Sequence, residues 1–93
     1  MPTAEERRYR VLVHKTASKI LARLPKDLLR RITVALDGLA LDPRPSGCKK
    51  LAGKYDHYRV RVGDWRITYT IEDDMLVVTV IEIAPRGGAY RNL

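Results

Sequence analysis

The first alternation of apolar and polar positions lies near the start of the chain. Tyr9, Val11 and Val13 alternate there with the polar Arg10 and His14. A period of two is typical of a strand, because successive side chains of a strand point to opposite faces. This run therefore predicts a short first strand.

The spacing of the apolar residues that follow predicts two helices. Thr16 can cap a short first helix, whose apolar face is formed by Ile20, Leu21 and Leu24. Pro25 ends that helix or opens the next, since its missing N–H costs nothing at a first helical position. A longer amphipathic helix is indicated by apolar residues three and four apart, at Leu28, Leu29, Ile32, Ala35, Leu36 and Leu39. Two prolines and a glycine in residues 42–47 end it.

The second half of the chain predicts strands only. Residues 58–62 and 66–71 alternate, and the pair Gly63-Asp64 between them is a candidate two-residue hairpin turn. After a second turn, residues 76–84 are apolar on both faces, which is typical of a central strand. The sequence thus predicts one α+β domain over residues 1–93, in the order β-α-α-β-β-β. Its four-stranded antiparallel sheet has both helices packed on one face and leaves the other face open.

Composition narrows the class of protein further. The 18 Lys and Arg residues against 11 Asp and Glu give a net charge of +7, which indicates a polyanionic partner, either nucleic acid or an acidic protein. No apolar run is long enough to span a membrane and the first ten residues lack a signal-peptide core, so we expect a cytoplasmic protein. The single Cys48 excludes an internal disulfide. No Cys or His cluster has metal-ligand spacing, so neither a metal nor another cofactor is expected.

Basic side chains are expected to converge on the open sheet face. Arg59 and Arg61 are two apart in a strand and leave the same face, and Arg66 begins the neighbouring strand across the hairpin. Arg86 and Tyr90 follow the last strand, around a Gly-Gly pair that can bend back over the sheet. Guanidinium forks bind phosphate oxygens and an aromatic ring stacks on an unpaired base, so the set suggests RNA recognition. The alternative is a solvated strand face, which is what charge runs usually are.

The segment YRVRVGDWRITY at residues 58–69 resembles the RelE family of bacterial toxins. The same family pattern is met by Asp42-Pro43, by residues 50–53, by residues 80–86 and by Tyr90. The similarity extends over nearly the whole chain, from about Tyr9 onward. RelE relatives are small basic toxins that enter the ribosomal A site and cut messenger RNA there. The resemblance implies the same fold and a single RelE-like toxin domain.

The resemblance also implies the site residues and the chemistry. Catalytic roles are implied for Arg61, Arg66, Arg86 and Tyr90, and RNA contacts for Arg59, Lys49, Lys50 and Lys54. The implied enzyme is a metal-independent endoribonuclease, in which the 2′-hydroxyl of the RNA attacks the adjacent phosphate and leaves a 2′,3′-cyclic phosphate. The protein then supplies in-line orientation and positive charge.

The chain departs from the family at one point. Better-known members carry lysines where Arg59 and Arg61 stand, and an arginine stays protonated in a protein site, so neither can be a general base. Three alternatives remain for the proton of the 2′-hydroxyl. Positioning and positive charge suffice for the reaction without a protein base, or water or a ribosomal group takes the proton, or the activity is weak. His57 is the better of the two histidines as a missing base, although surface placement is expected for both.

Partners follow from the resemblance as well. It implies an acidic RelB-like antitoxin in a toxin–antitoxin hetero-oligomer that also binds operator DNA through the antitoxin, and it implies the ribosome and messenger RNA as targets. No membrane contact is expected. Two alternatives remain: a ParE-like toxin that inhibits DNA gyrase without cutting RNA, and a catalytically weak binding module with the RelE fold. ParE-like chains generally lack the full arginine and tyrosine set, so its presence here favours the nuclease.

Overall fold

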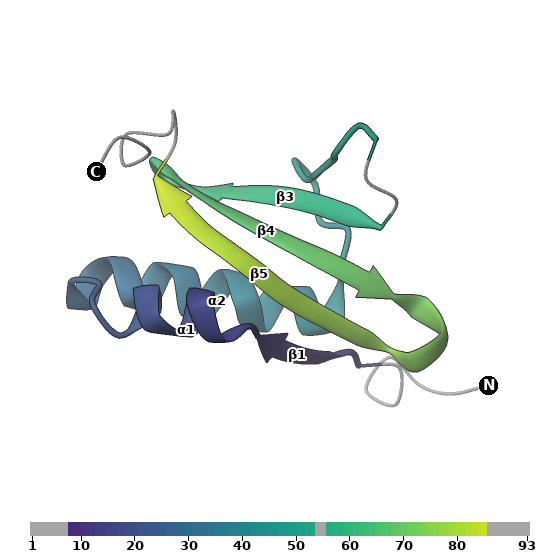
Figure 1. The fold of residues 1–93 in the computed structure, drawn as a ribbon, viewed down its shortest axis with the longest axis horizontal. Helices are drawn as coiled ribbons and strands as arrows, with labels where there is room; N and C mark the ends of the chain where they lie inside the picture. Colours follow the sequence, from purple (N-terminus) through teal and green to yellow (C-terminus); the bar gives the residue numbers. More distant parts are fainter. Residues whose placement is uncertain (1–7, 54–55, 86–93) are drawn as a thin grey trace.

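The computed structural model describes residues 8–53 and 56–85 (Figure 1). The elements in chain order are β1 (Arg10–Val13), α1 (Lys15–Leu21), α2 (Lys26–Leu41), β2 (Lys49–Lys50), β3 (His57–Val62), β4 (Trp65–Glu72), the 3₁₀ helix η1 (Asp73–Met75) and β5 (Val77–Pro85). No helix in these segments is long and apolar enough to cross a membrane. The predicted site residues Lys54, Arg86 and Tyr90 lie outside the described residues.

The predicted α+β class and helical pair are confirmed, and the sheet requires a correction. It has five strands in the order β1-β5-β4-β3-β2, and β1 pairs with β5 in parallel while the other neighbours are antiparallel. Alternation along β1 gives its faces but not its direction, so the parallel pairing had no local signal. The fifth strand, β2, consists of two exposed lysines and carries no apolar alternation. The prediction that the last strand is central is confirmed, because β5 lies between β1 and β4.

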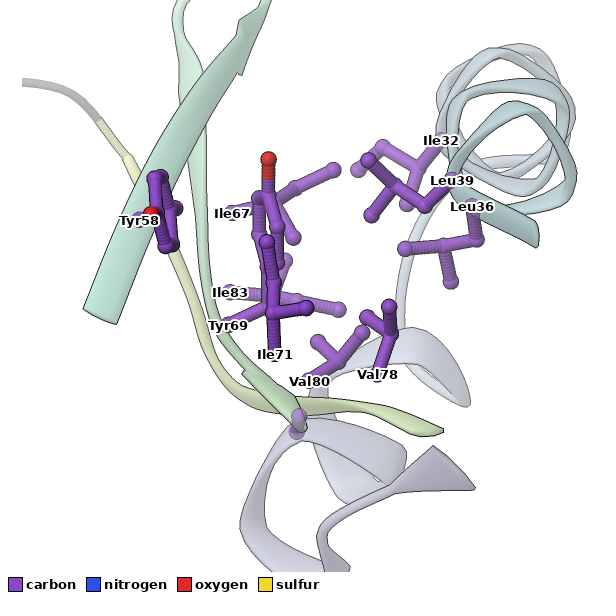
Figure 2. Close-up of a cluster of buried hydrophobic side chains, with 11 residues drawn as sticks. Ile32, Leu36, Leu39, Tyr58, Ile67, Tyr69, Ile71, Val78, Val80 and Ile83 are labelled. Atoms are coloured by element: carbon purple, nitrogen blue, oxygen red, sulfur yellow. The ribbon is translucent and has the colours of Figure 1, made fainter. Parts of the chain in front are cut away.

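Both helices lie on one side of the sheet, as predicted (Figure 1). The core forms where α2 packs on β4 and β5. Figure 2 shows the buried side chains of Ile32, Leu36 and Leu39 pointing from the helix toward those of the two central strands. The strand residues facing them are Ile67, Tyr69, Ile71, Val78, Val80 and Ile83. Burial of this continuous apolar layer is the main stabilising contribution to the fold.

The first helix begins differently from the prediction. His14, not Thr16, is the N-cap of α1, and the His14 Nδ1 accepts a hydrogen bond of 3.2 Å from the backbone N–H of Thr16. An imidazole nitrogen can satisfy a free helix N–H as a hydroxyl does, although histidine is not among the favoured capping residues. Pro25 occupies the N-cap of α2, in agreement with the predicted break between the helices.

The predicted hairpin turn connects β3 to β4. Val62 and Trp65 are paired across Gly63 and Asp64. Gly63 has φ +60°, and among the described non-glycine residues only Asp56 and Leu76 have positive φ, so Asp64 does not. A positive φ at the first turn position alone is a type II′ turn, which requires glycine at that position. This explains why the order is Gly-Asp in this chain.

Candidate functional site

The register of the sheet brings four cations together on its open face. Arg61 is directly opposite Arg66, and Lys49 is directly opposite Arg59. Opposite residues of an antiparallel pair share a face, with Cβ atoms about 4.5–5.5 Å apart. Because Arg59 and Arg61 are two apart in β3, they also share a face, and all four side chains leave the side that the helices do not cover.

These four residues line a hollow of about 480 Å³. Its other lining residues are Ser46, Gly47 and Val60. Of the described residues that line it, none is acidic. We call this feature the basic hollow. The positive charge and the N–H groups of its three arginines and one lysine suit the oxygens of phosphate groups. Arginine binds such oxygens in a bidentate manner.

Arg66 carries an unsatisfied group at the wall of the basic hollow. Its Nε is buried and has no hydrogen-bond partner in the described part of the chain. A buried donor without a partner destabilises a fold by about 1–3 kcal/mol. Arg61, directly opposite, adds like-charge repulsion between the two guanidiniums. Local conflicts of this kind are expected where a sequence serves a ligand as well as its own stability.

Arg66 also borders a second, mainly apolar groove of about 530 Å³. The groove runs between α1 and the ends of β4 and β5, and its walls include Ile20, Trp65 and Ile81. The Arg66 guanidinium therefore lies between a charged surface and an apolar one.

A polar cluster, the Arg44–Asp73 cluster, anchors the loop that leads into the basic hollow. The two terminal nitrogens of Arg44 donate to the carboxylate of Asp73 at 2.9 and 3.2 Å, and its Nε donates to the Tyr58 hydroxyl at 3.2 Å. The Tyr9 hydroxyl donates to the same carboxylate at 2.6 Å. The hydrogen bonds from Arg44 and Tyr9 lower the pKa of Asp73 to about 2. Two residues after Arg44, Ser46 begins the wall of the basic hollow.

The Arg44–Asp73 cluster was not predicted from the sequence. In the sequence, Asp73 belongs to a predicted solvated turn, and Arg44 is one of several cations in a basic stretch. The two are 29 residues apart in the chain, so no local pattern connects them. The fold pairs the Arg44 charge with a carboxylate, whereas no such pairing holds the cations of the basic hollow among the described residues.

The structure separates the predicted site residues into three groups. Arg59, Arg61, Arg66 and Lys49 lie together at the basic hollow. Lys50 is opposite Tyr58 and therefore belongs to the other face of the sheet. Lys54, Arg86 and Tyr90 lie outside the described residues. β5 ends at Pro85, opposite Trp65, so the chain leaves the sheet beside the hairpin that carries the two opposed arginines.

The described residues contain no group of three or more His, Cys, Asp or Glu side chains that could hold a metal ion. His57 is on the same face as the arginines, opposite Thr70, but it does not line the basic hollow. It is four positions from Arg61 along β3, or about 13 Å at the usual rise of a strand.

Three comparisons with known proteins agree on the kind of protein. Residues 11–90 match the family described as the ParE toxin of the type II toxin–antitoxin system parDE. A protein of Methanocaldococcus jannaschii that bears the name toxin RelE1 is 32% identical over 88 residues, which cover 91% of this chain and 98% of that protein.

Solved structures give the same result. The archaeal RelE–RelB complex from Pyrococcus horikoshii contains a chain that is 37% identical, with a TM-score of 0.78, over 87% of this chain and 98% of that chain. The toxin–antitoxin complex RelBE2 from Mycobacterium tuberculosis contains one that is 26% identical, with a TM-score of 0.73, over 85% of this chain and 99% of that chain.

Proposed function

Because the chain belongs to the RelE/ParE superfamily of toxins from toxin–antitoxin systems, we propose that it is an endoribonuclease that cuts messenger RNA in the ribosomal A site. The observation that carries the proposal is the basic hollow. Four cations face one space on the open sheet surface, and none of its described lining residues is acidic. The fold places the like charges of Arg61 and Arg66 side by side and leaves the Arg66 Nε without a partner among the described residues. Both features destabilise the protein alone, and an anionic ligand would relieve them.

The proposed reaction uses the RNA as its own nucleophile. The 2′-oxygen bonds to the adjacent phosphorus while the bond from phosphorus to the 5′-oxygen breaks, which leaves a 2′,3′-cyclic phosphate and a 5′-hydroxyl. Negative charge accumulates on the non-bridging oxygens in the transition state. Arg61 and Arg66 stand next to each other on the same face of the hairpin, so both guanidiniums can bind these oxygens.

The remaining predicted residues extend this site. Lys49 and Arg59 lie on the same surface and are proposed to contact the RNA there, with the Arg59 guanidinium bound to a phosphate. Arg86 and Tyr90 are proposed to complete the site from the segment that follows β5, with the tyrosine ring stacked on a base. Each of these roles rests on the residue types and on the family resemblance.

The proposed protein partner is an acidic antitoxin of the RelB kind. The P. horikoshii structure is a RelE–RelB complex, and the M. tuberculosis structure is the toxin–antitoxin complex RelBE2. A net charge of +7 favours rapid association with an acidic chain and makes the rate of association sensitive to salt. We further propose that the complex binds operator DNA through the antitoxin and that the toxin acts in the cytoplasm, where ribosomes are.

One observation favours a second candidate function. The matching family is described as a ParE toxin, and ParE-like toxins inhibit DNA gyrase. The two functions differ in what they damage. A nuclease fragments messages that are being translated and stops protein synthesis, whereas a gyrase inhibitor causes DNA damage and leaves messages intact.

The test uses purified toxin and ribosomes programmed with a defined message. The nuclease proposal predicts cleavage at the A-site codon, and it predicts that Arg61→Ala and Arg66→Ala reduce the rate about 10²–10³-fold each, as loss of a transition-state contact does. Arg30→Ala, which removes an exposed charge from α2, is the matched control and should leave the rate unchanged. An intact message together with inhibited gyrase supercoiling would replace this proposal by the second candidate.

A further inference from the structure

The proposed reaction needs an acceptor for the proton of the 2′-hydroxyl, and most of the basic hollow cannot provide one. Arg59, Arg61 and Arg66 keep their protons in protein sites. The Ser46 hydroxyl is a weak base. Among the described lining residues, Lys49 alone carries a group that can exist as a charged or a neutral amine.

The sheet places Lys49 within reach of the two opposed arginines. It is directly opposite Arg59 in the β2–β3 pair, and Arg61 is the next residue of β3 on the same face. Cβ atoms of opposite residues are about 5 Å apart, and a lysine side chain extends about as far again. An oxygen of a nucleotide held between Arg61 and Arg66 therefore lies within the range of the Lys49 amine.

The Lys49 side chain is also accessible to a ligand. The side chain is exposed, and no hydrogen bond or ion pair with the described residues engages it. The three guanidiniums of the same surface supply the positive charge that binds a phosphodiester, so the Lys49 amine is not needed there as a cation. A single phosphodiester carries one negative charge, which is less than the combined positive charge of the three arginines.

We infer that Lys49 is the general base of this toxin, an inference that rests on the proposed function. The amine nitrogen takes the proton from the 2′-hydroxyl as the oxygen–phosphorus bond forms. The bond from phosphorus to the 5′-oxygen then breaks, and the 5′-oxygen takes a proton from water. Lys49 thus fills the role that Arg59 and Arg61 cannot perform, from a neighbouring strand that local sequence patterns do not reveal.

The experiment measures single-turnover cleavage of ribosome-bound message as a function of pH. Lys49→Arg keeps the charge and the length of the side chain but removes the titratable amine. The rate of the unmodified protein should rise with pH and level off once the amine is neutral. Lys49→Arg should be slower by about 10²-fold or more at alkaline pH, the usual contribution of a general base, and its rate should not level off.

The chain provides a matched control at the next position. Lys50 is in the same two-residue strand and is equally exposed, but it is opposite Tyr58 and faces the other side of the sheet. Lys50→Arg should keep the rate and the pH profile of the unmodified protein. Lys49→Ala adds a chemical test, because methylamine should restore its rate in proportion to the neutral amine present, whereas guanidinium should not.

The outcomes separate the two proposals. An unmodified protein that does not cut ribosome-bound message refutes the proposed function and, with it, the role of Lys49. If the unmodified protein cuts and Arg66→Ala does not, but Lys49→Arg retains the rate and the levelling of the pH profile, only the assignment of Lys49 is wrong. Failure of methylamine to restore Lys49→Ala would contradict the assignment in the same way.

Discussion

Replacing Arg66 by methionine should stabilise the fold while it abolishes the proposed activity. Methionine occupies most of the same space along β4 without a guanidinium, so the buried Nε that lacks a partner among the described residues is removed. The substitution also removes one of the two like charges that Arg61 and Arg66 place opposite each other. Stability and activity then change in opposite directions, which general damage to the fold cannot produce.

The size of the effect follows from these two contacts. Relief of a buried unsatisfied donor contributes about 1–3 kcal/mol, and relief of a cross-strand repulsion contributes at most about 1 kcal/mol. Loss of packing by the arginine stem offsets part of this gain. We expect the free energy of unfolding to rise by about 1–2 kcal/mol. For a domain of this size, each kcal/mol raises the melting temperature by roughly 4–8 °C.

The assay combines urea unfolding, thermal unfolding and single-turnover cleavage on the same preparations. Arg30→Met is the control, because it removes the same charge from an exposed position of α2 and exchanges two residues of similar helix propensity. Its stability should change by less than about 0.5 kcal/mol. Arg66→Met should cut message about 10²–10³-fold more slowly than Arg30→Met.

Two results would contradict this expectation for Arg66→Met. If Arg66→Met is destabilised, the buried Nε is not a cost that the fold carries. If it is stabilised and still cuts at the normal rate, the unsatisfied guanidinium serves no substrate and the basic hollow is not the site.

Three further outcomes are expected. The pKa of Asp73 is lowered to about 2 by its hydrogen bonds from Arg44 and Tyr9, so this carboxylate stabilises the fold above the usual unfolded value of about 3.9, and its contribution is lost as the pH falls toward 2. Asp73→Asn should therefore weaken the loss of stability between pH 5 and pH 2 in urea titrations, and an unchanged slope would contradict the role of the Arg44–Asp73 cluster. Tyr69→Phe should cost about 1–2 kcal/mol of unfolding free energy, because its buried hydroxyl donates to the Pro43 carbonyl at 2.8 Å, and equal urea midpoints would show that this bond contributes nothing. Arg86→Ala with Tyr90→Ala should abolish growth arrest by the expressed toxin without changing its melting temperature by more than a few degrees, and full toxicity of the double variant would remove both residues from the site.

Much of the fold could be predicted because its core obeys simple periods. The three- and four-residue spacing of α2 and the alternation in β3 and β4 are each set by one apolar face, so the sequence displays them directly. The direction of β1 could not be predicted in this way. Its pairing with β5 depends on how the intervening helices and strands place the two segments relative to each other. Nor could β2, whose two lysines bury no apolar face and whose place depends on hydrogen bonds to β3.

The candidate site could also be predicted only in part, because alternation shows which residues of one strand share a face but not which strands are neighbours. Alternation alone put Arg59, Arg61 and Arg66 on the open face, and the register confirms that they share it. Lys49 and Lys50 look equivalent in the sequence, and only the pairing of β2 with β3 assigns one to the basic hollow and the other to the opposite face. Contacts between distant segments, such as the pairing of a loop arginine with a turn carboxylate, have no signature in a single sequence.

Cleavage of messenger RNA on the ribosome is the activity proposed for the basic hollow. The most direct measurement maps the ends of a defined ribosome-bound message after incubation with the purified toxin or its Arg61→Ala, Arg66→Ala double variant. We expect a single cut within the A-site codon, a 2′,3′-cyclic phosphate on the upstream fragment, and an intact message with the double variant. An intact message with the unmodified toxin, or equal cleavage by the double variant, would contradict this proposal.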